Sequence, residues 1–295
     1  MTTGVTDPFA YHAPATVREA SQALSRYRGD AKLLAGGHSL IPMMKLRIAS
    51  PQAIVDLRNI DDLKGISETD DGGLMIGSMT TYHELITSDL VNSKAQAIAE
   101  AAAQVADTQV RNWGTIGGSL AHADPAGDLP AVAVALDFQI HASSARSDRT
   151  ISCDRFFRGY LETALRANEV LTGVSCAASG DGSGSAYVKL ANKASHYAIV
   201  GVAAAISIDA GGMCTAARIG ITGAGPHAVR SRRAERILVG KELSSNVIAR
   251  AAQRGGAELA GLFNDDVHAS AEYREAMTKV YTERAIALAT ERASG

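Results

Sequence analysis

The sequence predicts an α+β protein of two domains. In the first part of the 295-residue chain, short apolar runs typical of buried strands alternate with stretches of helical spacing. In the second part the strand-like runs come first and the helical runs follow, which is typical of an α+β domain. The glycine-rich residues 180–184 separate the two patterns and are the best linker candidate.

The N-terminal residues predict a small α/β layer. Thr16 and Glu19 have the spacing of a capping box, so a helix is expected from there to about Tyr27. Strands are expected at residues 31–35 and 53–57, and Pro42 suits the first turn of a helix between them. A glycine motif, which we call the first motif, stands at the end of the first strand, where such layers bind ligands. Its residues are Ala35, Gly36, Gly37, His38 and Ser39.

Further elements follow from periodicity, capping boxes and turn residues. Helices are expected from the capping box at Thr81 and at residues 94–105, 234–238, 245–262 and 271–292. Strands are expected at residues 74–76, 138–141, 170–174, 186–189, 199–208 and 216–221.

A second motif lies about eighty residues after the first. It begins with small residues that predict a turn and continues with two aspartates, Asp124 and Asp128. An apolar run that predicts a helix follows them. Such glycine turns let a ligand approach the backbone, and their consecutive N–H groups can bind an anion. Two of them could grip one diphosphate, although ordinary tight turns are the alternative. The turn residues are Thr115, Ile116, Gly117, Gly118 and Ser119.

Neither motif fits a common nucleotide-binding fingerprint. The Rossmann pattern G-x-G-x-x-G and the Walker Gly-Lys-Ser/Thr are both absent from them. The carboxylates of Asp124 and Asp128 suit ribose or ribityl hydroxyls, and a helix N-cap is the alternative for Asp128. His38 and His122 lack further ligands at suitable spacing, so packing or hydrogen bonding is favoured over a metal site.

Composition narrows the function class. A net charge of −2 and a pI of about 6.4 disfavour nucleic-acid binding. No apolar run reaches the roughly 18 residues of a membrane span, and the N-terminus lacks a signal-peptide layout, so a cytoplasmic protein is expected. Cys153, Cys176 and Cys214 are scattered and predict neither a disulfide nor a zinc or iron–sulfur site. The sequence offers no Ser/His/Asp or Cys/His arrangement that would require a nucleophile or a base.

The two motifs resemble the FAD signatures of the molybdenum hydroxylase flavoproteins. This group includes the medium subunit of aerobic carbon monoxide dehydrogenase and the FAD domains of xanthine dehydrogenases. The matching segments are AGGHSLIPMMKLR at residues 35–47 and TIGGSLAHADPAGDLPA at residues 115–131. YVKL at residues 187–190 and the following KASHYAIVGVA resemble the start of the family's C-terminal domain.

The resemblance implies a fold with two regions. Residues 1–177 would form an FAD-binding region of the vanillyl-alcohol-oxidase-like (PCMH) type, with subdomains of about 1–57 and 58–177. Residues 178–295 would form a C-terminal flavoprotein domain, in which a three-stranded antiparallel sheet packs with helices.

The resemblance also implies roles for single residues. Both motifs would bind the FAD pyrophosphate, and Asp124 or Asp128 would contact its adenosine or ribityl hydroxyls. Lys189 would lie near the flavin as a positive group, and Tyr197 against the isoalloxazine ring. The alternatives are a solvated strand lysine and a half-buried tyrosine at a strand edge. Family members often have an acidic residue before the aromatic one, whereas this chain has His196.

The implied function is that of one subunit in an electron relay. A large subunit would carry the molybdenum cofactor and a small subunit the [2Fe–2S] clusters. The assembly would be a dimer of heterotrimers, and the FAD held here would deliver electrons to an external acceptor. The chemistry would belong to the cofactor, so the resemblance implies no catalytic residue in this chain.

Two alternatives remain open from the sequence. One is a self-sufficient flavin oxidoreductase, with His38, His122 and His196 as candidate bases. The other is a non-catalytic nucleotide-binding assembly module. In the second case a docking patch is possible, although a solvated helix face is the plainer interpretation. The patch residues would be Arg230, Arg232, Arg233 and Arg236.

Overall fold

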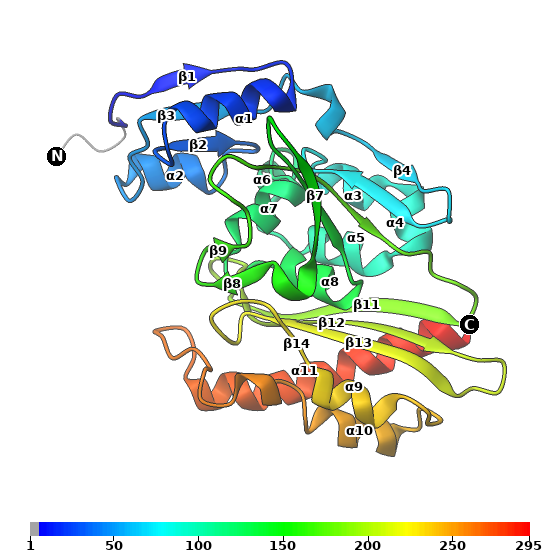
Figure 1. Ribbon diagram of the computed structural model, residues 1–295. Coiled ribbons are helices and arrows are strands. Elements are labelled where there is room, and N and C mark those ends of the chain that lie inside the picture. Colours follow the sequence, from blue (N-terminus) through cyan, green and yellow to red (C-terminus); the bar gives the residue numbers. More distant parts are fainter. Residues whose placement is uncertain (1–5) are drawn as a thin grey trace.

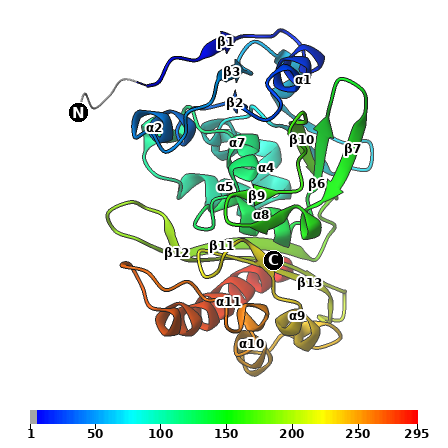
Figure 2. The same cartoon turned by 60° about the vertical axis from the view of Figure 1, so that its left-hand side comes forward.

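A computed structural model of the protein describes residues 6–295. It confirms the α+β class: a small sheet, a central sheet with helices, and a C-terminal sheet covered by helices follow one another down the molecule (Figure 1). The turned view shows the C-terminal sheet lying between the central helices and α9 to α11 (Figure 2). Within residues 6–295, no helix combines the length and the apolar character that a membrane crossing requires.

The N-terminal unit is a parallel three-stranded sheet with two helices. Its strand order is β1-β3-β2. The Thr16 hydroxyl caps α1 by accepting from the N–H of Glu19, as predicted, and Pro42 lies in the first turn of α2. The first motif therefore leaves the C-terminal end of β2, as expected for a ligand loop. The elements are β1 (Ala10–His12), α1 (Val17–Arg26), β2 (Ala31–Leu34), α2 (Leu40–Lys45) and β3 (Ala53–Asp56).

The central unit is an antiparallel five-stranded sheet with six short helices. The predicted helix at residues 94–105 is the shorter α5, residues 96–103, because the backbone of Ala95 (φ −153°, ψ 57°) separates it from the helix before it, α4. Several short elements had no clear signal in the sequence. The strands, in sheet order, are β4 (Ile66–Glu68), β5 (Leu74–Gly77), β10 (Val170–Cys176), β6 (Gln139–Ser143) and β7 (Asp148–Ser152), with a hairpin of β8 (Phe157–Gly159) and β9 (Glu162–Thr163). The helices are α3 (Tyr82–Thr87), α4 (Asp89–Lys94), α5 (Gln96–Ala103), α6 (Thr108–Arg111), α7 (Ile116–His122) and α8 (Leu129–Ala135), with 3₁₀ turns η1 (Asp61–Leu63) and η2 (Cys153–Arg155).

The C-terminal unit has three long antiparallel strands, and a two-residue fourth strand extends the predicted three-stranded sheet. The prediction of a helix at residues 245–262 is wrong about where this helix ends. It stops at Ala252, because Gly255 and Gly256 follow and Gly256 has a left-handed φ of 72°. The elements are β11 (Ser183–Ala191), β12 (Ala198–Ile208), β13 (Cys214–Thr222), β14 (Val229–Arg230), α9 (Arg232–Leu238), α10 (Ser245–Ala252), η3 (Ala257–Leu259) and α11 (Ala271–Ser294).

The C-terminal sheet buries both faces. Tyr187 and its cross-strand partner Ala203 join the core of the central unit, whereas their neighbours Ala186 and Val202 pack under α11. Strand β13 also lies close to α8, because a Cβ on Gly220 would stand 2.0 Å from the Ala131 carbonyl oxygen. The sheet is therefore pressed against the helix that follows Asp124 and Asp128.

Candidate functional site

The structure brings the two glycine motifs into direct contact. A Cβ on Gly36 would lie 2.1 Å from the Trp113 carbonyl oxygen and 2.9 Å from the Gly114 Cα. A Cβ on Gly118 would lie 3.6 Å from that of Ala35. Because Gly36 and Gly118 lack side chains, two segments about eighty residues apart form one continuous wall.

The first motif offers unused backbone donors. Gly37 has a φ of 75°, which reverses the chain as only glycine does readily. Within residues 6–295, the N–H groups of Gly36, Gly37, His38 and Ser39 have no protein acceptor. Consecutive N–H groups around a left-handed residue form an anion-binding nest, so this loop suits a phosphate.

The second motif differs from the prediction, because it is the first turn of α7 and not a turn between elements. The N–H groups of residues 116–119 all donate within the protein; Gly117 bonds the Ser78 carbonyl at 2.9 Å and Gly118 the Thr115 hydroxyl at 3.1 Å. The predicted second nest is therefore wrong. This motif presents hydroxyl groups and the bare Cα of Gly118 to the first one.

Both motifs line a cavity of about 880 Å³. This volume falls within the range of roughly 300–1,000 Å³ that is usual for small-molecule and cofactor sites. Of the predicted site residues, Ala35, Gly36, Gly37, His38, Ser39, Thr115, Gly117, Gly118, Ser119, Asp124, Asp128 and Tyr197 line it, and Ile116 and Lys189 do not.

The two exceptions lie behind the wall. Ile116 is fully buried in the central core. The side chain of Lys189 is 1 % exposed, so it is not a solvated strand lysine. Its ammonium group donates to the carbonyls of Gln104 at 2.7 Å and His196 at 2.8 Å, and pairs with the Asp128 carboxylate at 2.9 Å. Lys189 thus supports two cavity segments without reaching the cavity itself.

Asp128 stands at the N-cap position of α8 but does not cap it with its side chain. Its carboxylate accepts from the Tyr187 hydroxyl at 2.5 Å and from Lys189. Burial raises the pKa of Asp128 to about 6, against the opposing effect of the Lys189 charge and the Tyr187 hydrogen bond. Asp128 therefore has the N-cap position of the alternative without its capping bond, and its buried carboxylate joins the central and C-terminal units at the cavity wall.

The raised pKa of Asp128 predicts a pH effect on stability. Because the folded protein holds this proton more tightly than the unfolded chain, stability should fall as pH rises from about 4 to about 6. Two pKa units correspond to roughly 3 kcal/mol. Chemical denaturation of the flavin-free protein between pH 4 and 6 should show that the free energy of unfolding falls with pH in the wild type and falls less in Asp128→Asn. The same pH dependence in both proteins would contradict this prediction.

Asp124 and Tyr197 border the same cavity. Asp124 accepts from the N–H of Ala126 at 2.8 Å, and its other oxygen lies 3.9 Å from Nε2 of His122. Tyr197 is 48 % exposed in the loop before β12, next to His196 with its left-handed φ of 60°. Each leaves polar or aromatic surface free toward the cavity.

Several cavity residues carried no recognisable signal in the sequence. Lys32 and Arg166 bring positive charge to the wall. Ser78 has a buried hydroxyl with no partner among residues 6–295, and burial raises the pKa of Tyr82 to about 12. These residues come from separate strands and loops, and only the tertiary fold collects them. The cavity thus combines free N–H groups, which can bind phosphates, with the carboxylates of Asp124 and Asp128, which can bind hydroxyl groups. This combination fits a dinucleotide such as FAD.

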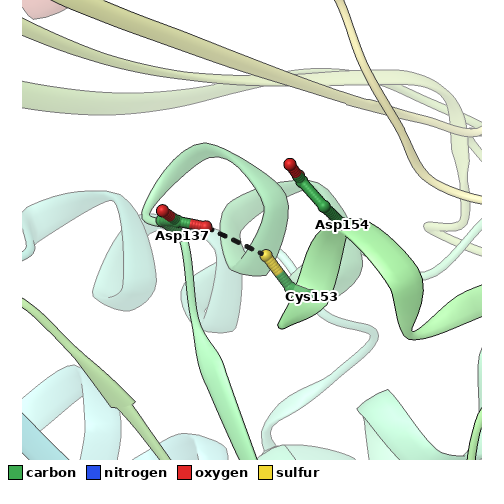
Figure 3. A group of neighbouring side chains, drawn as sticks. All are labelled: Asp137, Cys153 and Asp154. Carbon is green, nitrogen blue, oxygen red and sulfur yellow. Dashed lines mark hydrogen bonds between the residues drawn. The ribbon is translucent and has the colours of Figure 1, made fainter. Parts of the chain in front are cut away.

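A different cluster has the spacing of a metal site but the wrong chemistry (Figure 3). The potential ligand atoms of Asp137, Cys153 and Asp154 lie within 4.8 Å of one another. Arg218 pairs with Asp137 at 2.8 Å and with Asp154 at 3.2 Å, and burial raises the pKa of Cys153 to about 12. Carboxylates that are already paired with an arginine, beside a thiol that keeps its proton, do not suit a metal cation.

The same cluster corrects the interpretation of the arginines near α9. Arg230 and Arg232 pair with Asp154 at 3.3 and 2.6 Å. These two pairs tie the C-terminal unit to the central one, whereas the exposed side chains of Arg233 and Arg236 agree with the solvated helix face.

Comparison with known proteins decides the family. Residues 7–176 match the model of the FAD binding domain in molybdopterin dehydrogenase, and residues 185–289 that of the CO dehydrogenase flavoprotein C-terminal domain. The chain belongs to this flavoprotein family. The predicted FAD-binding fold and resemblance are thereby confirmed.

Members of the family are similar over nearly the whole chain. The carbon monoxide dehydrogenase medium chain of Hydrogenophaga pseudoflava is 38% identical, with 94% of this chain and 96% of that protein covered. The 6-hydroxypseudooxynicotine dehydrogenase complex subunit alpha of Paenarthrobacter nicotinovorans is 36% identical, with 97% and 95% covered. The structure of reconstituted CO dehydrogenase from Oligotropha carboxidovorans superimposes with a TM-score of 0.93 at 36% identity, covering 98% and 99% of the two chains.

Proposed function

We propose that this chain is the FAD-binding subunit of a molybdenum hydroxylase complex. It takes electrons from an iron–sulfur subunit and passes them to an external acceptor. The observation that carries the proposal is that the two signature motifs touch and together form one wall of a cofactor-sized cavity. Bound FAD supplies the redox chemistry, while the chain binds, orients and shields it.

The residues divide the work of binding. The free N–H groups of residues 36–39 hold the diphosphate, and α7 continues the same wall through Gly118 and Ser119. Asp124 and Asp128 accept from cofactor hydroxyls, and Tyr197 covers the ring system. Lys189 acts behind Asp128, whose charge and position it fixes.

The partners follow from the same proposal. A large subunit carries the molybdenum cofactor, a small one carries the [2Fe–2S] clusters, and the assembly is a cytoplasmic dimer of heterotrimers. Residues 1–177 form the FAD-binding domain, with subdomains of about 1–57 and 58–177, and residues 178–295 form the C-terminal domain. The turn between β10 and β11 supports this division.

Purification of the chain from its own cells tests the proposal. We expect a yellow protein with one FAD that co-purifies with a large molybdenum protein and a small iron–sulfur protein. The isolated chain should not reduce its flavin with small organic substrates, because the proposal assigns substrate oxidation to the large subunit. Flavin reduction by the chain alone would favour the self-sufficient flavin oxidoreductase. A colourless protein that takes up no FAD would reject both this enzyme and the proposed FAD-binding subunit.

A further inference from the structure

The segment that carries Asp124 and Asp128 has no regular structure of its own and is held from the C-terminal domain. The carbonyl groups of residues 125–127 all accept hydrogen bonds from that domain. The contacts are Gly223 N–H to Pro125 O at 2.7 Å, Ala198 N–H to Ala126 O at 3.2 Å and the Thr222 hydroxyl to Gly127 O at 2.7 Å.

The donors of these bonds sit at two adjacent strand ends. Ala198 is the first residue of β12, and Thr222 is the last of β13. Gly223 follows with a φ of 79°, and a Cβ there would stand 2.6 Å from the Ala198 carbonyl oxygen. The position of residues 124–128, which we call the cofactor segment, therefore depends on the position of these two strand ends.

One buried arginine fixes both ends. Arg274 of α11 is 4 % exposed. One terminal nitrogen of its guanidinium donates to the carbonyls of Ile199 at 2.7 Å and Gly223 at 2.9 Å, and the other pairs with Asp266 at 2.7 Å. Ile199 adjoins Ala198, so Arg274 binds the backbone beside each donor. The arginine itself does not line the cavity.

We infer that Arg274 is a positioning residue for FAD, acting through Thr222 and Gly223 on the segment at residues 124–128. The inference rests on the proposed function, because the ligand of that segment is taken to be FAD. Fixing a free residue on binding costs backbone entropy, so a segment that is ordered before binding holds its ligand more tightly. The C-terminal domain thus sets the affinity of a site that lies mainly in the other domain.

The test compares Arg274→Met with Arg232→Gln in the full chain. Both remove an arginine of the C-terminal domain, but Arg232 pairs with Asp154, away from the cofactor segment. Titration with FAD should show binding weakened roughly 5- to 150-fold by Arg274→Met, the usual size of coupling between sites, and unchanged by Arg232→Gln. In flavin-free protein, hydrogen exchange at the Ala198 and Gly223 amides should accelerate only in Arg274→Met.

Thr222→Val provides a milder variant in case Arg274→Met does not fold. It removes the hydroxyl that reaches the Gly127 carbonyl and keeps the side-chain shape. It should weaken FAD binding in the same direction. Wild-type affinity in both folded variants, or in Thr222→Val alone if the other is unfolded, overturns the inference, as does faster exchange without weaker binding. Failure of the wild-type chain to bind FAD overturns the proposed function instead, and the inference about FAD with it.

Discussion

Gly118→Val is expected to abolish FAD binding and to leave the flavin-free protein folded. A Cβ at this position meets only the Thr115 hydroxyl at 2.8 Å and the Ala35 Cβ at 3.6 Å. Disturbing that N-cap hydroxyl costs about 1 kcal/mol of stability. The valine methyl groups would instead occupy the space between the motifs, so binding should weaken more than about a hundredfold, or roughly 3 kcal/mol.

Two other glycines make the experiment decisive. Gly180→Val is the matched control, because nothing lies within 4 Å of a Cβ there and its φ is not left-handed. Gly117→Val should unfold the protein, because its Cβ would stand 2.6 Å from the Ser78 carbonyl oxygen. FAD titration with thermal unfolding separates these cases. Retained FAD in folded Gly118→Val would contradict the site.

Asp128→Ala is expected to damage stability and FAD binding together. Removal of the carboxylate leaves the Lys189 ammonium buried without its counter-ion. Breaking one side of a buried ion pair costs about 3–5 kcal/mol of folding free energy. The loss of a hydrogen-bonding partner should weaken FAD binding by a further 1–3 kcal/mol, about one to two orders of magnitude. Chemical denaturation of the flavin-free chain and FAD titration measure the two effects separately.

A double variant separates the two roles of Asp128. Asp128→Ala with Lys189→Met removes the unpaired charge, so most of the lost stability should return. FAD affinity should stay low, because the carboxylate that faces the cavity is still missing. A double variant that regains FAD affinity as well as stability would show that Asp128 serves only the fold.

The first motif could be predicted because its rules are local. An apolar strand, two glycines and a helix with an early proline follow one another within residues 31–45, and each step obeys a known preference. The structure places β2, the left-handed Gly37 and α2 in that order. The free N–H groups follow directly from this backbone path.

The second motif could not be predicted in the same way, because its conformation depends on distant packing. Glycine disfavours helices by about 1 kcal/mol, so Gly117 and Gly118 favour a turn on local grounds. In the fold, Gly117 is required where α7 presses on Ser78. Tertiary packing therefore outweighs the local preference.

The burial of Lys189 also could not be predicted from the sequence. Its partner Asp128 is 61 residues away, and the pair meets only because β11 turns one face toward the central unit. The resemblance singled out both residues, but nothing in the sequence shows that each is the other's partner.

The most direct measurement of the central claim is a crystal structure of the FAD-bound chain. The distances to determine join the diphosphate oxygens to the backbone nitrogens of Gly36, Gly37, His38 and Ser39. We expect hydrogen-bond distances of about 2.7–3.2 Å, with Gly118 beside the diphosphate in the same wall. A diphosphate bound elsewhere, with these four N–H groups turned to water, would contradict the account.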